Sequence, residues 1–460
     1  MPENLTRREF MKELGKLGAA ASLAPLVVNS EQHSDKATTM KRPSFIAEVD
    51  QPTTEVDWDQ LQRYDETNTA RRGFVKYVGE DALTKLGDKQ KTNLDKFLKE
   101  NKPGYTLKDR ALQSGVGAGG ADRSFLGPQT AKTPEDLGVA KWTGTPEEAS
   151  QIVTAALRHF GAATVGFVEL DPNTTEKLIY SVDPDGKEMK ILDVDEPAED
   201  ETSRTIPKKA RWVVVYTVQM SEETMTRVPT VLGALTTSLT YTRAENIQIR
   251  LQEFLRGLGY MGLGESSTNA LGIAPAFGVM SGLGELSRLN RLITPEYGPM
   301  VRVFKLLTDL PLAPTKPIDA GIMRFCADCI KCADLCPSKA LSFAKEPSWE
   351  TQGGWNNPGH KAYFENSPRC RTYWYEVGTN CGICFAVCPF ASKNLASYNR
   401  MRNALIGTVP MFNKPLKSLD DLLYTPTTEL GKPQKDPEAW WSLNLPDYGV
   451  DTVQTVRETS

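Results

Sequence analysis

The sequence predicts an α+β protein in which an α/β domain is followed by a small cysteine-rich domain. Segments with helical and strand periodicity alternate over residues 141–315, and all eight cysteines lie between Cys326 and Cys388. With 460 residues, 40% of them hydrophobic and 24% charged, the chain can form two or three domains with buried cores. Its formal net charge of -4 offers no basic surface for nucleic acid, so we expect no nucleic-acid partner.

The N-terminal segment is first basic and then apolar. Arg7 and Arg8 stand side by side in LTRREFMKELGKLGAAASLAPLVV, and a modest apolar run follows from Leu14 to Val28. This order predicts a twin-arginine export signal over residues 1–35. The run is shorter than the roughly 20 residues of a membrane span, so we expect it to be removed and any membrane attachment to come through a partner. Because this route exports folded proteins, often with a cofactor, we expect a cofactor site further along the chain.

The α/β domain is predicted from four segments. Pro146 opens a helix, a strand follows over 163–170, and RWVVVYTVQM predicts a second buried strand. Between the strands, the acidic DVDEPAEDETSR predicts a solvated loop. VPTVLGALTTSLTYTRAENIQIRLQEFLRGLGY then predicts a long helix, whose apolar face comprises Tyr241, Ala244, Ile247, Leu251, Leu255 and Leu258.

The flanking regions are less periodic. Residues 36–140 are polar and proline-bearing, and predict an N-terminal extension of short helices and loops. Residues 401–460 predict a C-terminal extension that packs on the core. GVGAGG matches the dinucleotide fingerprint G-x-G-x-x-G, but it follows the polar LKDRALQS rather than a strand, so we expect no dinucleotide site there. The later glycine-rich segment, MGLGESSTNALGIAPAFGVMSGLGEL, permits either close approach of backbone to something flat or bulky, or ordinary loop geometry.

The cysteine spacing predicts a ferredoxin-like domain over residues 316–400. CADCIKCADLCP has the spacing C-x2-C-x2-C-x3-C-P, in which three thiolates hold one cluster and the fourth reaches another. In CGICFAVCP the first ligand is missing, because Gly378 stands at its position, and Cys370 is the one cysteine left to replace it. The spacing argues against disulfides. We therefore assign two [4Fe-4S] clusters, the first to Cys326, Cys329, Cys332 and Cys388, and the second to Cys336, Cys370, Cys381 and Cys384.

Several stretches in this order resemble one family. They are the twin-arginine leader, GLGELSRLNRLITPEYGPMVRVFKLLTDLPL, KPIDAGIMRFCADCIKCADLCPSKAL and NCGICFAVCPF. Together they are similar to the respiratory reductive dehalogenases, corrinoid and iron-sulfur enzymes of organohalide-respiring bacteria, over nearly the whole chain. The resemblance implies a nitroreductase-like, corrinoid-binding α/β domain over 141–315. It also implies replacement of halogen by hydrogen on a small organohalide, with a Co(I) corrinoid of the cobalamin type.

The resemblance further implies partners and a location. These are a membrane-anchor subunit, a quinone-linked electron donor, the twin-arginine export machinery and the outer, periplasmic face of the cytoplasmic membrane. The histidines bear on the corrinoid. A histidine-ligated, base-off corrinoid uses D-x-H-x-x-G, but His159 and His360 are preceded at the aspartate position by Leu157 and Pro358, and His33 lies in the leader tail. We therefore expect a base-off corrinoid without a histidine ligand, as the resemblance implies.

The resemblance also implies the residues of the reaction. A proton donor near cobalt should be a weak acid held by a cation that stabilises its anion. Tyr241 matches the proton donor, Arg302 the cation and Asn269 a nearby polar residue. Tyr297 in PEYGP is a rival that we interpret as structural. Candidate walls of a halocarbon pocket are Trp142, Trp355 and Trp374, each of which also suits a core position.

Two alternatives remain open. An enzyme similar to epoxyqueuosine reductase would share the corrinoid and the paired clusters, but it acts on tRNA in the cytosol. The export signal, the composition, and Tyr241 in place of that family's acidic proton donor argue against it. An exported iron-sulfur electron carrier without catalytic chemistry would leave the large domain before Cys326 unexplained.

Overall fold

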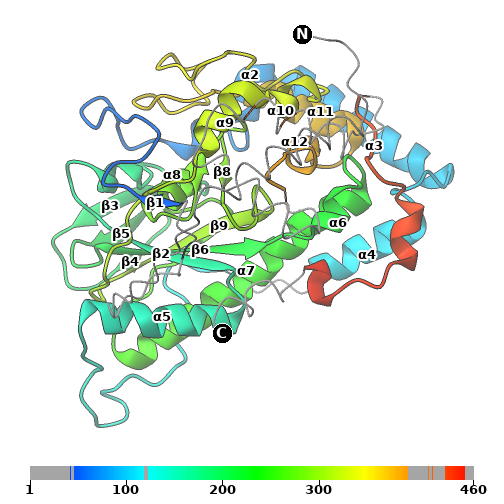
Figure 1. Cartoon of the computed structure of the whole chain (residues 1–460). Helices are drawn as coiled ribbons and strands as arrows, with labels where there is room; N and C mark the ends of the chain where they lie inside the picture. The colour runs from blue at the N-terminus through cyan, green and yellow to red at the C-terminus, as the bar shows by residue number, and fades with distance from the viewer. Residues whose placement is uncertain are drawn as a thin grey trace, which may run out of the picture. The chain divides into compact units, whose positions relative to one another are not determined.

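The computed structural model describes residues 42, 46–118, 123–391, 413, 417 and 430–450 (Figure 1). The predicted export signal over 1–35 lies outside these residues, and the predicted C-terminal extension over 401–460 is described only at 413, 417 and 430–450. We find no helix in the described part of the chain that is both long and apolar enough to cross a membrane.

The elements follow one another as a mixture of helices and short strands. The helices are α2 (Phe74–Val78), α3 (Glu80–Lys99), α4 (Leu107–Gly117), α5 (Pro146–Phe160), α6 (Glu222–Met225), α7 (Val231–Leu258), α8 (Ala274–Met280), α9 (Ile322–Cys329), α10 (Lys331–Asp334), α11 (Ser367–Val377) and α12 (Ile383–Ala386). The strands are β1 (Ala47–Glu48), β2 (Thr164–Glu169), β3 (Glu188–Leu192), β4 (Ala198–Glu199), β5 (Ser203–Pro207), β6 (Trp212–Gln219), β7 (Glu285–Leu286), β8 (Leu292–Ile293), β9 (Val301–Thr308) and β10 (Ile318–Asp319).

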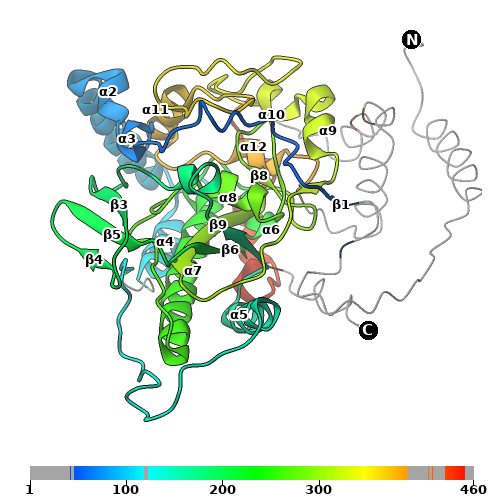
Figure 2. The same ribbon diagram turned by 90° about the vertical axis from the view of Figure 1, so that its left-hand side faces the viewer.

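The central sheet is antiparallel and has the strand order β2-β6-β9. Its side chains alternate between two faces, as the pleat requires. Val214, Tyr216 and Val218 face a core shared with α5 and α7, whereas Val213 and Val215 face a second core that includes residues of α8. Figure 1 and Figure 2 show α5 and α7 together on one side of the sheet. The predicted fold class and the two predicted strands are confirmed, but β9 is a strand that the sequence analysis missed.

The two predicted helices of this domain are confirmed, and their ends have physical causes. Thr145 and Glu148 form a reciprocal capping box at the start of α5, and Gly161 ends the helix in the left-handed region at φ 108°. Thr230 accepts a hydrogen bond from the Gly233 N–H at the start of α7. Along the predicted apolar face of α7, four side chains are buried, namely Ala244, Ile247, Leu251 and Leu255; Tyr241 and Leu258 are half-buried.

Two expectations for irregular regions need correction. The N-terminal extension contains α3, a helix of 20 residues, so its helices are not all short. The acidic stretch predicted as a solvated loop contains β4 and the first residues of β5, because β5 pairs with both β3 and β4. Most of its side chains are nevertheless exposed.

The structure explains both glycine patterns noted in the sequence. Gly115 and Gly117 lie at the end of helix α4 rather than after a strand, so the context of a dinucleotide site is missing. In the glycine-rich segment, a Cβ at Gly272 would overlap the Leu178 carbonyl oxygen, and one at Gly284 would overlap that of Ile293. These glycines therefore allow close approach of protein backbone to protein backbone, which favours the loop-packing interpretation.

A third core joins the predicted α/β and ferredoxin-like domains. It contains Met225 and Val228 from the first domain together with Phe325 and several cysteines from the second. In Figure 1 and Figure 2 the helices of the second domain, α9 to α12, gather above the central sheet. Because the two parts share one core, the cysteine block is held rigidly against the elements that carry Tyr241 and Arg302.

Candidate active site

All eight cysteines are free of disulfides, and six of them are fully buried. The cysteines lie on or beside the short helices α9, α10, α11 and α12. Burial raises the pKa of the Cys326 thiol, because the surroundings disfavour a thiolate. No three cysteine, histidine or acidic side chains in the described residues converge on one point as a single metal ion requires.

The cysteines divide into two neighbouring sets. In the first, Cys326 interacts electrostatically with Cys329 and Cys388, and Cys332 interacts with the same three thiols. In the second, Cys384 interacts with Cys381 and Cys336, and Cys370 interacts with Cys384 and Cys336. The two sets are adjacent, because the Cys332 thiol also interacts weakly with the Cys384 thiol. The division of these cysteines between two clusters, as predicted from the spacing, stays a prediction.

Two arginines from the segment just before β8 interact with the two cysteine sets, one with each set. Arg288 is 1% exposed; its Nε donates to the Cys326 carbonyl at 2.9 Å, and its guanidinium lies 4.0 Å from the centroid of the Tyr363 ring. Arg291 donates to Glu365 at 2.7 Å. The Glu365 carboxylate raises the pKa of Arg291, and the thiols Cys370 and Cys384 contribute in the same direction. The sequence analysis did not identify either arginine, because both act on residues distant in sequence.

Tyr241 lies on α7 with its ring fixed by aromatic packing. The ring of Phe304, on β9, meets it edge-on, with centroids 5.7 Å apart. Phe304 in turn stacks on Tyr216 of β6 at 5.5 Å. The phenol ring is thus tied to the central sheet, while the side chain stays half-buried. The ring of Tyr241 is therefore fixed by packing, and its predicted role as proton donor remains a prediction.

Arg302 lies between Tyr241 and the cysteine domain. Its guanidinium carbon is 5.8 Å from the centroid of the Tyr241 ring and 5.1 Å from that of Phe385, which adjoins Cys384. Its Nη2 donates to Thr237 at 3.2 Å, one turn before Tyr241 on α7. The structure therefore brings two of the predicted site residues together, and it places the second cysteine set beside them.

Asn269 is not joined to this pair. It lies in a turn with a left-handed backbone, φ 66°, and it is half-buried. No hydrogen bond among the described residues links its side chain to Tyr241 or Arg302. Its predicted role in the reaction remains a prediction.

The sequence analysis missed a network of charged groups that reaches Tyr241 through Arg71. Arg71 interacts electrostatically with both Tyr241 and Glu66. Burial raises the pKa of Glu66 to about 7, although Arg72 and Arg71 oppose the rise. On β9, Lys305 forms an ion pair with Glu265 at 2.5 Å, and both side chains are 1% exposed. These groups come from segments far apart in sequence, and no local pattern reveals their convergence.

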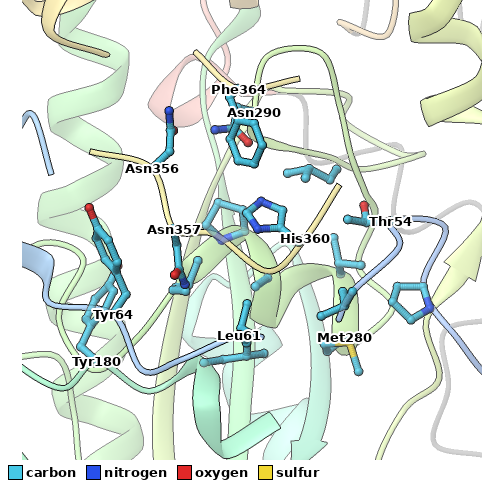
Figure 3. Close-up of a pocket in the computed structure, with 18 of the residues that line it drawn as sticks. Thr54, Leu61, Tyr64, Tyr180, Met280, Asn290, Asn356, Asn357, His360 and Phe364 are labelled. Carbon is cyan, nitrogen blue, oxygen red and sulfur yellow. The ribbon is translucent and has the colours of Figure 1, made fainter. Parts of the chain in front are cut away.

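A cavity of about 190 Å³ lies between residues 52–69 of the N-terminal extension, α8 and the loop over residues 355–364. Figure 3 shows several of its residues, among them Tyr64, His360 and Asn357. Most of the wall is apolar, with contributions from Trp58, Leu61, Leu178, Ile273, Pro275, Val279, Met280, Leu286, Trp355 and Phe364. Tyr180 connects this cavity with the charged groups, because Glu66 and Glu265 both raise its pKa in addition to burial.

Some of the aromatic and histidine candidates line this cavity, and others lie elsewhere. Trp355 lines the cavity, as expected of a pocket wall. Trp142 instead packs against the core between the sheet and α7, and Trp374 is 38% exposed on α11, so neither lines this cavity. His360 is also in the wall, and burial lowers its pKa to about 4. His159 is exposed on α5.

A mixed domain that shares a core with two sets of four cysteines defines a redox protein of the iron-sulfur class. Comparisons with known proteins give the family. The family described as "Reductive dehalogenase subunit" matches residues 41–184 and 187–312, and "4Fe-4S double cluster binding domain" matches residues 325–391. The chain therefore belongs to the reductive dehalogenase family, whose members are oxidoreductases acting on carbon-halogen bonds, and it contains a double [4Fe-4S] domain.

Individual relatives agree with this family. The tetrachloroethene reductive dehalogenase of Sulfurospirillum multivorans is 29% identical over 97% of this chain and 95% of the relative. The trichloroethene reductive dehalogenase of Dehalococcoides mccartyi is 26% identical over 97% of this chain and 98% of its own length. The solved structure of the catabolic reductive dehalogenase NpRdhA has a similar fold, with a TM-score of 0.61 and 22% identity over 85% of this chain and 50% of that chain.

The family match bears on both alternatives. It covers the large domain before the cysteines, so a carrier that consists only of clusters does not describe this chain. The family that matches most of the chain is that of the dehalogenases, as the resemblance in the sequence predicted. An epoxyqueuosine reductase of Lactococcus garvieae is 30% identical, but over only 27% of this chain and 33% of its own length.

Proposed function

We propose that this chain is the catalytic subunit of a respiratory reductive dehalogenase that acts on a small organohalide. In the overall reaction the carbon-halogen bond breaks, a carbon-hydrogen bond forms and halide leaves, with the uptake of two electrons and one proton. The observation that carries the proposal is the convergence of Tyr241, Arg302 and Phe385, which joins a phenolic proton donor to the cysteine domain.

The residues around Tyr241 fit a corrinoid. Four buried polar atoms there have no hydrogen-bond partner in the described part of the chain, namely Glu66 Oε2, Glu265 Oε2, Arg123 Nη1 and Arg302 Nε. A corrin ring carries peripheral amides, which can donate to carboxylates and accept from guanidinium groups. Of these side chains, Glu66, Glu265 and Arg302 would hold the base-off corrinoid, and Arg123 is not assigned to it. When bound, the corrinoid in its Co(I) state supplies the reducing power that no side chain has.

Tyr241 supplies the proton in this proposal. A phenol is a weak acid, and the anion it leaves requires a nearby positive charge. Arg302 provides that charge at the ring, and its bond to Thr237 keeps the guanidinium in place. Asn269 is proposed as a polar residue next to the substrate.

Electrons reach the site through two [4Fe-4S] clusters. Cys326, Cys329, Cys332 and Cys388 would hold one cluster, and Cys336, Cys370, Cys381 and Cys384 the other. The second cluster would be the nearer one to the reaction, because Phe385 follows Cys384 and contacts Arg302. Thiolate ligands require deprotonated cysteines, and bound iron would offset the burial that raises the thiol pKa values.

The cavity beside Trp355 has the apolar walls that a small neutral organohalide requires, but neither Tyr241 nor Arg302 lines it, so proton transfer from Tyr241 would take place outside this cavity. Its volume of about 190 Å³ is too small for a corrinoid, and its walls are mostly apolar. Large rigid aromatics such as Trp58 and Trp355 exclude water, which favours halocarbon binding. The leader sequence and the family resemblance further support export by the twin-arginine route, a membrane-anchor subunit and a quinone-linked donor.

The first test is the metal content of anaerobically purified, corrinoid-reconstituted protein. We expect about one cobalt and eight irons per chain, and turnover of halogenated ethenes or ethanes with a reduced viologen dye. Eight irons without cobalt in well-folded protein would contradict the proposed function.

The second test is Tyr241→Phe, which removes the proton and keeps the ring packing on Phe304. We expect turnover to fall by at least 100-fold, the range that general acid catalysis contributes, with unchanged cobalt and iron content. Tyr297→Phe is the matched control and should retain most of the activity. Full activity of the Tyr241 variant would show that another group donates the proton.

A further inference from the structure

Three residues on one stripe of α7 organise the charges around the phenol. Thr237, Tyr241 and Glu245 are spaced four residues apart, so they lie on the same helix face, one turn above another. Thr237 accepts a hydrogen bond from Arg302 on the N-terminal side of the tyrosine. Glu245 forms an ion pair with Arg123 on the C-terminal side. The helix thus anchors one arginine on each side of Tyr241.

Arg123 contacts the same ring as Arg302. Its guanidinium carbon lies 5.9 Å from the centroid of the Tyr241 ring, against 5.8 Å for Arg302. Both Nε and Nη2 of Arg123 donate to Glu245 Oε1, at 3.2 Å and 2.9 Å. The Arg123 side chain is only 6% exposed, and its Nη1 is buried without a hydrogen-bond partner among the described residues. The Nη1 group of Arg123 is therefore a donor without a partner among the described residues, on a guanidinium that faces the Tyr241 ring.

The segment that carries Arg123 is fastened along α7. Gln252 donates to the Ser124 carbonyl at 3.2 Å, and Arg256 donates to the Ala131 carbonyl at 2.9 Å. These contacts run in the same order along the segment and the helix. They hold Arg123 in register with Tyr241, and they also mean that a loss of packing must be separated from a loss of charge.

We propose that Arg123 is a positioning residue that acts on Tyr241 as a second cation opposite Arg302. This inference rests on the proposed role of Tyr241 as proton donor. When the O–H bond of Tyr241 breaks and its proton moves to the substrate carbon, positive charge from both sides stabilises the remaining anion. The other charged groups that face Tyr241 are Arg71, which adds to this effect, and Glu245, which opposes it through its bond to Arg123.

The test measures the ionisation of residue 241 directly. A 3-fluorotyrosine is placed at position 241 of the corrinoid-loaded enzyme, with cobalt held as Co(III) and the clusters oxidised, and its 19F shift is followed against pH. Arg123→Ala should move the titration of this phenol to higher pH, because the positive charge beside the ring is lost. In the enzyme with natural Tyr241, the same substitution should lower kcat about tenfold with little change in KM, and Arg123→Lys should restore most of it.

Two further variants separate charge from structure. Glu245→Gln keeps an acceptor for Arg123 but removes the opposing charge, so it should lower the pKa of the phenol, a direction that loosened packing does not give. Arg256→Ala loosens the same segment on the same helix at a distance from Tyr241, and should leave the pKa unchanged. If Arg123→Ala folds poorly, the opposite shift expected of Glu245→Gln and the behaviour of Arg123→Lys still decide the question.

The outcomes distinguish this inference from the proposed function. An unchanged phenol pKa in the Arg123 and Glu245 variants would overturn the role of Arg123 even if Tyr241→Phe abolishes turnover. Equal losses of kcat in Arg123→Ala and Arg256→Ala, with no change in pKa, would assign Arg123 to packing alone. Retained turnover in Tyr241→Phe would contradict the proton donor itself, whatever the titration shows.

Discussion

Replacement of Arg302 by alanine should slow the reaction by one to two orders of magnitude. The guanidinium lies 5.8 Å from the centroid of the Tyr241 ring. At an effective dielectric constant of about 20, a unit charge at this distance stabilises the phenolate by about 3 kcal/mol. That energy corresponds to about 100-fold in rate, and solvent near the half-buried ring reduces it towards 10-fold. We therefore expect kcat of Arg302→Ala to be about 10- to 100-fold lower.

The assay is steady-state turnover with a reduced viologen dye, together with cobalt and iron analysis of each preparation. Arg243→Ala is the matched control, because Arg243 lies on the same helix, two residues from Tyr241, but contacts the Gln219 carbonyl and the Tyr448 ring instead. It removes the same charge without removing a contact to the phenol. If Arg302→Ala and Arg243→Ala show equal kcat at equal cofactor content, the electrostatic reasoning is wrong.

Two predictions concern stability. Gly284→Ala should lower the free energy of unfolding by about 1–3 kcal/mol, because the new methyl group overlaps the Ile293 carbonyl, whereas Gly117→Ala, in an open position on α4, should be neutral or stabilising in the same thermal melts. An unshifted melting temperature for Gly284→Ala would contradict the packing argument. Glu66 has a folded pKa of about 7 against a usual 4.5, so the folded state binds its proton more tightly and the protein should lose about 3 kcal/mol of stability as pH rises from about 4.5 to 7. Glu66→Gln should abolish most of this loss in melts recorded across that range, and an identical pH dependence in both proteins would refute it.

The elements that could be predicted from the sequence are those with a local signal. Helix α5 has a capping box, a proline at its start and a glycine at its end, and β6 is an unbroken run of β-branched and aromatic residues. The cysteine domain follows from spacing alone. In each case the signal lies within a few residues of the element it specifies.

Strand β9 could not be predicted because its sequence contains charges. VRVFKLLT places Arg302 and Lys305 in a strand that is otherwise apolar. Lys305 is buried only because Glu265, 40 residues earlier, neutralises it. When the partner that neutralises a buried charge lies far away in the sequence, the local pattern of a buried strand predicts a loop instead. For the same reason the sequence analysis did not identify Arg123, because its partner Glu245 lies 122 residues away in the sequence.

The missed strand also explains why the site is rigid. Arg302 pairs across the ladder with Val218, and Phe304 pairs with Tyr216, so two of the groups that contact the Tyr241 ring take their positions from the central sheet. Residues on a sheet hold their geometry more precisely than residues on loops. Since Arg302 also contacts Phe385 beside the second cysteine set, one strand fixes the distance between the proposed proton donor and the nearer cluster. A substitution that displaces β9 should therefore reduce turnover as well as stability.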